Sequence, residues 1–514
     1  MSTITTRTRA VLDRALAVYA GDPAAADVLR AHRERLDGPL RVALAGTLKA
    51  GKSTLLNALV GEQIAPTGTA ECTRVVTTYR DAPSARIVVT HRDGTPPTDL
   101  PVVHRRGALV IDLADTPVER VRALRVDWPS ASLRAVTLID TPGADSTRPG
   151  VAGRARAFLG AADPTAPAEG SDVTTVLDAA PGDGADVVLH LVRHLHGADV
   201  AFAETVGERA VRGIGPAGTV AVLSRADEIG GGRLDALVTA QQVARRYRAD
   251  PVLRGHCRTV VPVAGLLAET ARTLRGSEFA AVRDLAAGAR EDVEDLLLSA
   301  DRFLDAPGLE HLDRRARRTL LDRFGLHGLR LATTLVRRGA SDSAGLAAEL
   351  VRRSGLDDLR AVVGSQLLAH GDVFRARAAL GALERVLRAV PRPRQGGEDA
   401  AAGLAADVER VLTGAHEFVE QEALVTLPAR AGDELAEARR LLGGDGPAPA
   451  ARLGVAADVP AAEVRGLALD ALTRWRRAVE DPRSDRARTD LARVVARSVE
   501  GILAGVAAEA TAVR

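Results

Sequence analysis

One stretch near the start of the chain has the residue types and spacing of a phosphate-binding loop. Residues 46–54 read Gly-Thr-Leu-Lys-Ala-Gly-Lys-Ser-Thr and fit the pattern G-x-x-x-x-G-K-[ST] without a mismatch. Gly46 and Gly51 allow the backbone to wrap closely, so that successive amide N–H groups point toward phosphate oxygens. Lys52 would reach the terminal phosphates, and Ser53 would offer its hydroxyl to Mg²⁺. The stretch therefore predicts a nucleoside triphosphate site with magnesium.

The flanking residues supply the elements that such a loop needs. The apolar run 41–45 predicts a buried strand before it, and the run 55–59 predicts a helix after it. The only two lysines of the chain, Lys49 and Lys52, both lie in this loop, where a compact point charge suits phosphate. The loop residues that we expect to contact the nucleotide are Gly46, Lys49, Ala50, Gly51, Lys52, Ser53 and Thr54.

A second motif follows another apolar run. Residues 138–143 read Leu-Ile-Asp-Thr-Pro-Gly, so a buried strand would end at Asp140 and a turn would follow at Gly143. In phosphate-loop GTPases this aspartate reaches magnesium through water and this glycine meets the γ-phosphate. Downstream of a phosphate-binding loop, the pair predicts the second half of the same site.

A third motif carries information about the base. Residues 219–224 predict a buried strand, and the tetrad Ser224-Arg225-Ala226-Asp227 at its end is close to the guanine-reading pattern [NT]-K-x-D. Asp227 could accept hydrogen bonds from guanine N1–H and N2–H₂, whereas the unprotonated N1 of adenine would face it as a second acceptor. Arg225 keeps a long stem that could pack over the base. The alternative is a capping aspartate after a strand. The last predicted strand, 258–265, would place the backbone of Ala264 and Gly265 beside the base.

Composition limits the function classes. The 514 residues carry a net charge of +2 with 26% charged residues, so no bulk attraction to nucleic acid is expected. Aromatic residues make up 2%, which argues against platforms that stack bases. The two cysteines, Cys72 and Cys257, are far apart and favour a reducing compartment. We expect neither a signal peptide nor a membrane-spanning helix. His190, His194 and His196 are interpreted as surface residues rather than as metal ligands.

The pattern of apolar residues divides the chain into an α/β part and helical parts. Residues 7–37 favour helix, 40–275 favour alternating strands and helices, and the residues after 276 keep helical spacing almost throughout. Strand-like runs between 85 and 128 are expected to widen the sheet. We therefore predict three segments: an N-terminal helix of a neck bundle (1–37), a nucleotide-binding domain with a central, mostly parallel sheet (38–275), and an elongated α-helical bundle of neck and trunk (276–514).

The ordered motifs resemble those of the dynamin superfamily, and residues 65–77 and 223–228 resemble the isoniazid-inducible dynamin-like proteins of actinobacteria. The resemblance implies a GTPase that binds GTP, GDP and Mg²⁺ and that couples hydrolysis to self-assembly and to membrane binding or remodelling. It also implies a neck bundle that joins the N-terminal helix, the segment after the GTPase domain and the C-terminal helix. Independently of the family, the apolar face on 11–19 and the stripe at 491–506 are expected to be partners there. Carried over onto this chain, the residues that contact nucleotide or ion are Lys52, Ser53, Thr73, Asp140, Gly143, Ser224, Arg225, Asp227 and Ala264, with Ser53, Thr73 and Asp140 around the metal ion.

The loop departs from the eukaryotic dynamin pattern at two positions. Leu48 and Lys49 stand where that pattern has glutamine and serine, so the amide that orients water and a hydroxyl that helps to bind a monovalent cation are missing. We hypothesise that Lys49 supplies the missing positive charge, in the same chain or across a dimer, and count it with Lys52, Thr73 and Gly143 as a catalytic candidate.

Partners and alternatives follow from the same resemblance. We expect self-association through GTPase domains and trunk, a related dynamin-like protein or an anionic membrane as further partners, and a location on the inner face of the cell membrane. Residues 387–394 are the candidate lipid-contacting tip, with a solvated loop between helices as the alternative. Other readings are a regulatory or ribosome-assembly GTPase, an ATPase, and a GTP-binding scaffold with little hydrolysis.

Overall fold

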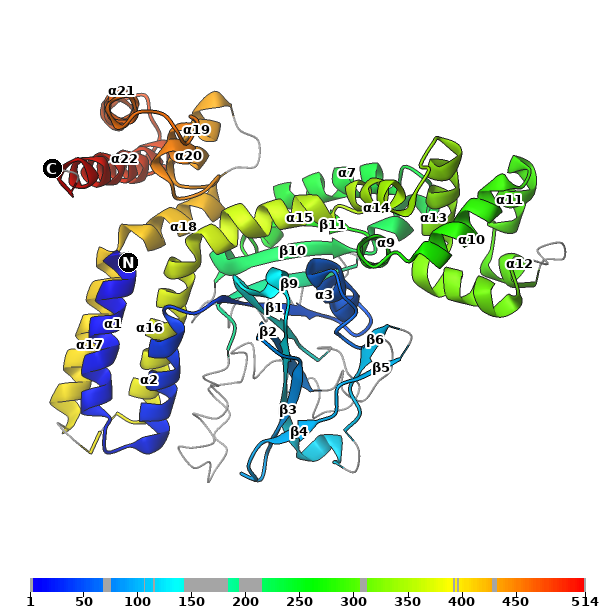
Figure 1. Cartoon of the computed structure of the whole chain (residues 1–514). Helices are drawn as coiled ribbons and strands as arrows, with labels where there is room; N and C mark the ends of the chain where they lie inside the picture. The colour runs from blue at the N-terminus through cyan, green and yellow to red at the C-terminus, as the bar shows by residue number, and fades with distance from the viewer. Residues whose placement is uncertain are drawn as a thin grey trace.

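The computed structural model describes most of the chain. The described residues are 3–67, 75–105, 107–113, 116–142, 184–193, 215–305, 312–391, 393–394, 397–427 and 432–512. They form a mixed sheet near the middle of the molecule, with helical units at either side of it (Figure 1). The expectation of an α/β nucleotide-binding domain joined to a largely helical C-terminal half is confirmed.

The sheet has nine strands among the described residues, in the order β11-β10-β9-β1-β8-β2-β7-β3-β4. The five strands from β11 to β8 are parallel to one another. The next strand, β2, runs in the opposite direction, because it pairs antiparallel with β8, and β7 runs parallel to β2. The strands are β1 (Leu40–Gly46), β2 (Val76–Asp81), β3 (Arg86–His91), β4 (Thr98–Leu100), β7 (Val121–Trp128), β8 (Val136–Asp140), β9 (Val187–Val192), β10 (Thr219–Ser224) and β11 (Thr259–Val263).

The strand-like runs between 85 and 128 belong to two different sheets. β3 and β7 widen the sheet as expected, whereas the run that begins at Ala108 forms β6 (Ala108–Val110), which pairs with β5 (Val103–Arg105) in a separate hairpin. The central strands β9 and β10 are buried at every position, as strands covered on both faces must be.

Helices cover both faces of the sheet and extend beyond it. On one side, α3 (Lys52–Val60) and α15 (Leu356–Val362) share a core with the sheet. On the other side lies a second core that continues away from the sheet (Figure 1). The helices of this second core are α7 (Ala236–Ala249), α9 (Gly265–Arg272), α10 (Gly276–Ala287), α11 (Arg290–Leu296), α12 (Ala300–Asp305), α13 (Arg314–Arg337) and α14 (Ser343–Arg352).

The first helices of the chain pack against helices from its last third. α1 (Thr3–Val18) and α2 (Pro23–Arg35) share a core with α16 (Gly371–Ala389) and α17 (Gly397–Gly414), and the four helices lie side by side in Figure 1. We call this four-helix unit the N-terminal bundle. Leu12 and Leu380 are fully buried in it.

The remaining helices form a separate unit, which we call the C-terminal unit. Its core contains the stripe at 491–506, which packs on α21 rather than on the N-terminal helix. The expected pairing of 11–19 with 491–506 is therefore wrong, because the two faces are buried in different cores. The helices of this unit are α18 (His416–Thr426), α19 (Asp433–Leu441), α20 (Pro449–Leu453), α21 (Ala461–Glu480) and α22 (Arg486–Ala512).

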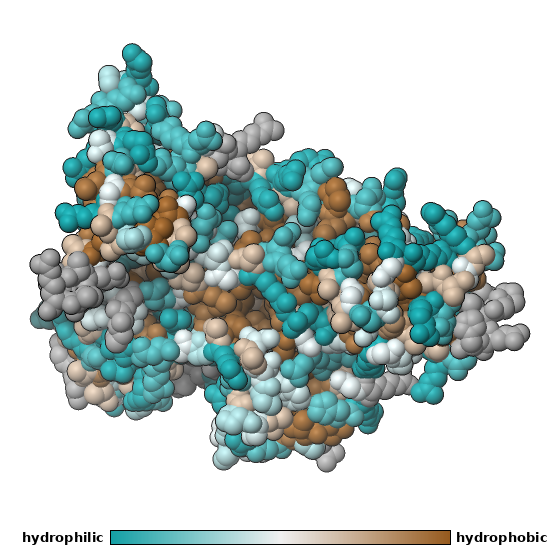
Figure 2. All heavy atoms as spheres, turned by 45° about the horizontal axis from the view of Figure 1, so that its top comes forward, coloured by the Kyte–Doolittle hydropathy of each residue, from teal (hydrophilic) through white to brown (hydrophobic). Residues whose placement is uncertain are grey.

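The side of the molecule shown in Figure 2 is mostly hydrophilic. On this face (Figure 2), hydrophilic side chains cover most of the surface, and apolar side chains gather in smaller areas. Among the described residues, no helix combines the length and the apolar character that a bilayer span requires.

Candidate nucleotide site

The phosphate-binding loop joins β1 to α3 at the carboxyl end of the parallel strands. Gly46 has a φ of 147°, and a Cβ there would lie 2.6 Å from the carbonyl oxygen of Leu191 on the neighbouring strand, so no larger residue fits. Gly51 begins α3 with a φ of 95° and open space around it. Lys49 also takes a left-handed backbone, with a φ of 62°, and its side chain is exposed. The loop is therefore bent where the motif requires it.

Lys52 is the buried charge of this loop. Its Nζ lies 3.2 Å from the carbonyl oxygen of Gly46 and 3.0 Å from that of Thr47, so the ammonium group sits inside the curve of the backbone. The amide of Ala50 donates to the Thr47 carbonyl at 3.2 Å, which tightens the same turn. Thr54 lies in the first turn of α3, with its methyl group near Gly265.

Ser53, in the first turn of α3, meets Asp140, the last residue of β8. β1 and β8 run parallel with Leu44 opposite Asp140, which brings the end of β8 next to the first turn of α3. The Ser53 hydroxyl donates to Asp140 Oδ2 at 2.6 Å, and Asp140 Oδ1 is buried without a hydrogen-bond partner among the described residues. Burial raises the pKa of Asp140, although the charge of Lys52 and the Ser53 hydroxyl act in the opposite direction.

The Ser224–Asp227 turn follows β10, two strands away from β1 in the sheet. The Ser224 hydroxyl donates to the carbonyl oxygen of Val192 at 3.2 Å and so fastens β10 to β9. Burial also raises the pKa of Asp227, the residue expected to read the base. Ala264, at the end of β11, is buried and its amide donates to the Ser354 carbonyl at 2.8 Å, so that amide already has a partner. Thr73 and Gly143 lie outside the described residues.

Hydrogen bonds join two of the expected site residues, and they bring in Arg193, which the motifs do not single out. Arg225 Nη2 donates to the carbonyl oxygen of Lys49 at 3.1 Å, and Glu228 accepts from both Arg225 and Arg193. Arg193 directly follows β9, and β9 lies between β1 and β10 in the sheet. The strand order, had it been known, would have placed Arg193 between the phosphate-binding loop and the Ser224–Asp227 turn. Together these side chains link the Ser224–Asp227 turn to the phosphate-binding loop.

The histidines near β9 require a correction. His190 is buried within the strand rather than on the surface, and burial with the nearby charges of Lys52 and His256 lowers its pKa to about 4. His194 and His196 lie outside the described residues. Within the part of the chain that the structure describes, no group of three or more His, Cys, Asp or Glu side chains could hold a metal ion.

A phosphate-binding loop on a parallel-stranded core, a serine bonded to a strand-end aspartate and an S-R-A-D turn two strands away define a phosphate-loop GTPase. Comparisons with known proteins agree. Residues 42–192 match the Dynamin family. The chain is 40% identical over 511 residues to the isoniazid-induced protein IniC of Mycobacterium tuberculosis (strain CDC 1551 / Oshkosh), a match that covers 97% of this chain and 98% of IniC. The chain therefore belongs to the dynamin family, among the bacterial dynamin-like proteins, and it is a GTPase that hydrolyses GTP.

Other similar proteins match over shorter stretches. A bacterial dynamin-like protein of Nostoc punctiforme is 30% identical over 131 residues, which cover 24% of this chain and 19% of that protein. The isoniazid-induced protein IniA of M. tuberculosis is 39% identical over 127 residues, 22% of this chain and 18% of IniA. Two solved chains of an oligomerised bacterial dynamin pair, described as sensing and tethering membranes, are 13% identical with TM-scores of 0.30 and 0.31. They cover 80% and 98% of this chain, and 80% of each solved chain is covered.

Proposed function

We propose that this GTPase works with Mg²⁺ and that it couples hydrolysis to self-association and to membrane binding or remodelling. The observation that carries the magnesium part is the contact between Ser53 and Asp140. A hydroxyl oxygen and a carboxylate oxygen lie side by side, and the second oxygen of the carboxylate has no hydrogen-bond partner among the described residues. Hard oxygen donors of this kind are the ligands that Mg²⁺ prefers.

The residues present therefore fit the ion. Ser53 would hold it directly, Asp140 would hold it through water, and Thr73 is the further ligand that the dynamin resemblance implies. The bound ion would neutralise charge on the β- and γ-phosphates. The raised pKa of Asp140 is consistent with a carboxylate whose favourable partner is a cation rather than bulk water.

The protein's own part in hydrolysis is to position GTP and to stabilise charge. The bent backbone from Gly46 to Gly51 presents amide groups to the phosphates, and Lys52 places its ammonium group within the same curve. The N-terminus of α3 adds partial positive charge at this point. Asp227 selects guanine, and the γ-phosphate contact is assigned to the Gly143 amide.

The charge that stabilises the transition state is assigned to Lys49. Its side chain is exposed at the mouth of the loop, next to the exposed Leu48, so it is free to face either its own nucleotide or that of a second GTPase domain. The exposed position of Lys49 supports a role across a dimer of GTPase domains.

Membrane contact is proposed for the end of the N-terminal bundle. The segment that joins α16 to α17, around residues 387–394, lies at the end of this bundle that points away from the C-terminal unit (Figure 1). Arg388 and Arg394 are exposed there. Each basic residue near an anionic surface contributes about 1 kcal/mol, so binding would require several copies acting together on the inner face of the cell membrane.

One observation favours the alternative, a regulatory GTPase that does not remodel membranes. The Tyr19 hydroxyl donates to the carbonyl oxygen of Val390 at 2.9 Å, and the amide of Arg394 donates to Asp22 at 3.1 Å. These bonds fasten the proposed tip to the turn between α1 and α2, as in a structural loop between helices. In either case, nucleic acid is not an expected partner.

Phosphate release from GTP tests both parts of the proposal. The assay is run at several protein concentrations, with Mg²⁺ or EDTA, and with or without anionic liposomes. We expect release that requires Mg²⁺, is lost in Ser53→Ala and rises with concentration and liposomes. Release that is unaffected by EDTA would contradict the magnesium assignment.

Flotation with the same liposomes tests the tip. The double variant Arg388→Gln/Arg394→Gln should float less than wild type. Arg465→Gln/Arg477→Gln, which removes two exposed charges from α21, should float like wild type. Equal flotation of the two double variants would reject residues 387–394 as the contact, and no flotation of wild type would favour the regulatory alternative.

A further inference from the structure

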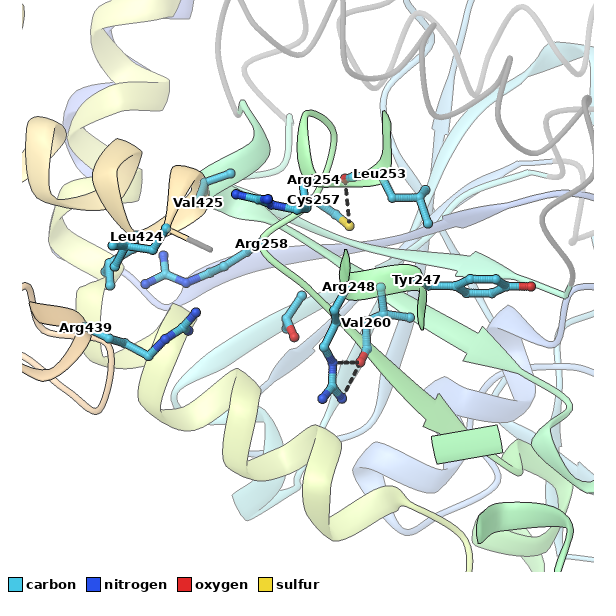
Figure 3. Close-up of a pocket in the computed structure, with 12 residues that line it drawn as sticks. Tyr247, Arg248, Leu253, Arg254, Cys257, Arg258, Val260, Leu424, Val425 and Arg439 are labelled. Atoms are coloured by element: carbon cyan, nitrogen blue, oxygen red, sulfur yellow. Dashed lines mark hydrogen bonds between the residues drawn. The ribbon is translucent and has the colours of Figure 1, made fainter. Parts of the chain in front are cut away.

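A cavity of about 240 Å³ lies between the edge of the sheet and the C-terminal unit, far along the sheet from the phosphate-binding loop. Four arginines line it: Arg248 and Arg254 from α7 and α8 (Pro251–Arg254), Arg258 just before β11, and Arg439 from α19. In Figure 3, the guanidinium groups of Arg258 and Arg439 point toward one another from these two parts of the molecule. The cavity therefore collects positive charge from both sides of a junction between units.

Arg258 is the most deeply placed of the four. The residue is 8% exposed, and its Nη1 donates to Gln421 at 2.6 Å and to the Ala217 carbonyl at 3.4 Å. Its Nη2 is buried and has no hydrogen-bond partner among the described residues. Burial and the positive charge of Arg439 lower the pKa of Arg258 to about 10. A buried guanidinium with an unused donor is costly unless a partner arrives.

No carboxylate within the described residues forms an ion pair with any of these four arginines. Arg248 donates twice to the carbonyl of Val260, at 2.9 and 2.7 Å, and Arg254 donates to the carbonyl of Thr426 at 2.7 Å. Burial lowers the pKa of Arg248, and the negative charge of Asp358 partly offsets this effect.

Some other arginines that are largely buried have an acidic partner. Arg323 pairs with Glu278 and Arg35 pairs with Asp186, each at 2.8 Å, and Arg452 pairs with Glu420. The four arginines that line the cavity lack the acidic partner that those three have among the described residues.

We propose that this cavity binds a compact phosphorylated anion of about the size of pyrophosphate. The guanidinium fork matches phosphate oxygens, and four such groups call for a multivalent anion rather than for a single carboxylate. The volume lies below the range of roughly 300–1,000 Å³ that is typical of sites for drug-sized ligands, so a whole nucleotide is less suitable than a small phosphate compound.

Such an anion would join two units of the protein. Arg254 and Arg258 belong to the sheet side, and Arg439 belongs to the C-terminal unit. Gln421, the partner of Arg258, contacts His370 at 3.2 Å, and His370 contacts the carbonyl of Gly443 at 2.7 Å. The buried polar chain thus runs from β11 through α18 to the start of α16 and to the end of α19, so occupation of the cavity would hold these elements together.

Calorimetric titration of the full-length protein with sodium pyrophosphate tests the site. Because pyrophosphate also fits a phosphate-binding loop, the protein is first saturated with GDP, and Lys52→Ala is titrated in parallel. We expect one binding event in both proteins. Arg439→Gln should weaken it about tenfold or more, because the group is charged and partly buried. Arg246→Gln, which removes an exposed charge from α7 outside the cavity, is the matched control and should bind like wild type.

Thermal unfolding shows whether each variant is folded. Pyrophosphate should raise the midpoint of GDP-saturated wild type and of Arg246→Gln, and it should raise that of Arg439→Gln by less at the same concentration. No binding to GDP-saturated wild type, or equal affinity in Arg439→Gln, would overturn the proposal.

Competition by glycerol 3-phosphate then distinguishes two sources of the phosphate group, a lipid headgroup and a free phosphate compound. Displacement at low concentration would assign the site to a lipid headgroup, and persistence of pyrophosphate would assign it to a free phosphate compound.

Discussion

The side chain of Arg225 connects the turn after β10 to the phosphate-binding loop, because its Nη2 donates to the carbonyl oxygen of Lys49 at 3.1 Å. Its Nη1 is held by Glu228 at 2.5 Å, and Glu228 is held in turn by Arg193 at 2.9 Å. Both Lys49 and Arg225 have a left-handed backbone, with φ values of 62° and 53°. The part of the site expected to read the base is therefore fastened to the part expected to hold the phosphates.

Removal of this link should weaken nucleotide binding. We expect Arg225→Ala to raise the Kd for GDP about tenfold, because a hydrogen bond from a charged donor typically contributes about 1.5–3 kcal/mol. Titration with a fluorescent GDP analogue measures the change. Arg193→Gln removes the other arginine from Glu228 without touching the loop and should leave the affinity unchanged. Equal losses in both variants would show that Glu228, rather than the link to Lys49, matters.

Asp227 should decide which base is accepted. Asp227→Asn replaces an acceptor by an amide, so a donor would face the guanine N2–H₂ and the affinity for GDP should fall about 100-fold or more. The same amide would match the oxygen at position 2 of xanthine, so xanthosine diphosphate should now bind better than GDP. Competition between the two diphosphates for each protein measures the switch. Retained preference for guanine would mean that Asp227 only caps the strand.

Lys49 should affect turnover more than binding. Lys49→Met keeps the length of the side chain and removes its charge, and we expect turnover to fall by about 10³ with little change in GTP affinity. Lys49→Arg should restore part of the rate. Leu48→Met changes the neighbouring exposed residue without a change in charge and serves as the control. Unchanged turnover in Lys49→Met would refute the catalytic role.

His190 should make the fold sensitive to acid. Its pKa is lowered from the ordinary 6.5 to about 4, so the native state keeps it neutral while the unfolded chain takes up a proton below pH 6.5. The stability contributed by the neutral ring is thus present above pH 6.5 and is lost as the pH falls toward 4, by about 3 kcal/mol in all.

Thermal midpoints between pH 7 and pH 4.5 measure this loss. The midpoint of His190→Asn should fall less steeply than that of wild type, whereas exposed His104→Asn should keep the wild-type slope. Some slope will persist in every variant because burial also lowers the pKa values of His32, His370 and His416. Identical slopes for wild type and His190→Asn would contradict the assignment.

Local patterns predicted the parts of the fold that depend on neighbouring residues. The runs before the phosphate-binding loop, before Asp140 and before Ser224 became β1, β8 and β10, because a continuous apolar run ending at a turn fits a strand covered on both faces. His190 was wrongly assigned to the surface, although it too lies in a strand that is covered on both faces. β9 lies between β1 and β10, where both faces of the sheet are covered, and a histidine there is buried whatever its polarity.

Long-range pairing could not be predicted in this way. An apolar stripe such as 491–506 shows that a face will be buried, but it does not show which helix will cover it, and α21 rather than α1 does so. The arginine-lined cavity is a similar case, since its residues come from separate segments at 247–260, 424–427 and 439. The spacing of residues along the chain does not predict that these segments will meet in the fold.

The pairing of α1 and α2 with α16 and α17 also constrains how the protein is made. Synthesis runs from the N-terminus, and the partners of the first two helices leave the ribosome only after residue 414. At about 5–20 residues per second, the first helices would wait for roughly 20 to 80 s with their apolar face exposed. Over that interval the nascent chain would present a hydrophobic surface suited to chaperone capture, and the bundle could close only when translation is well advanced.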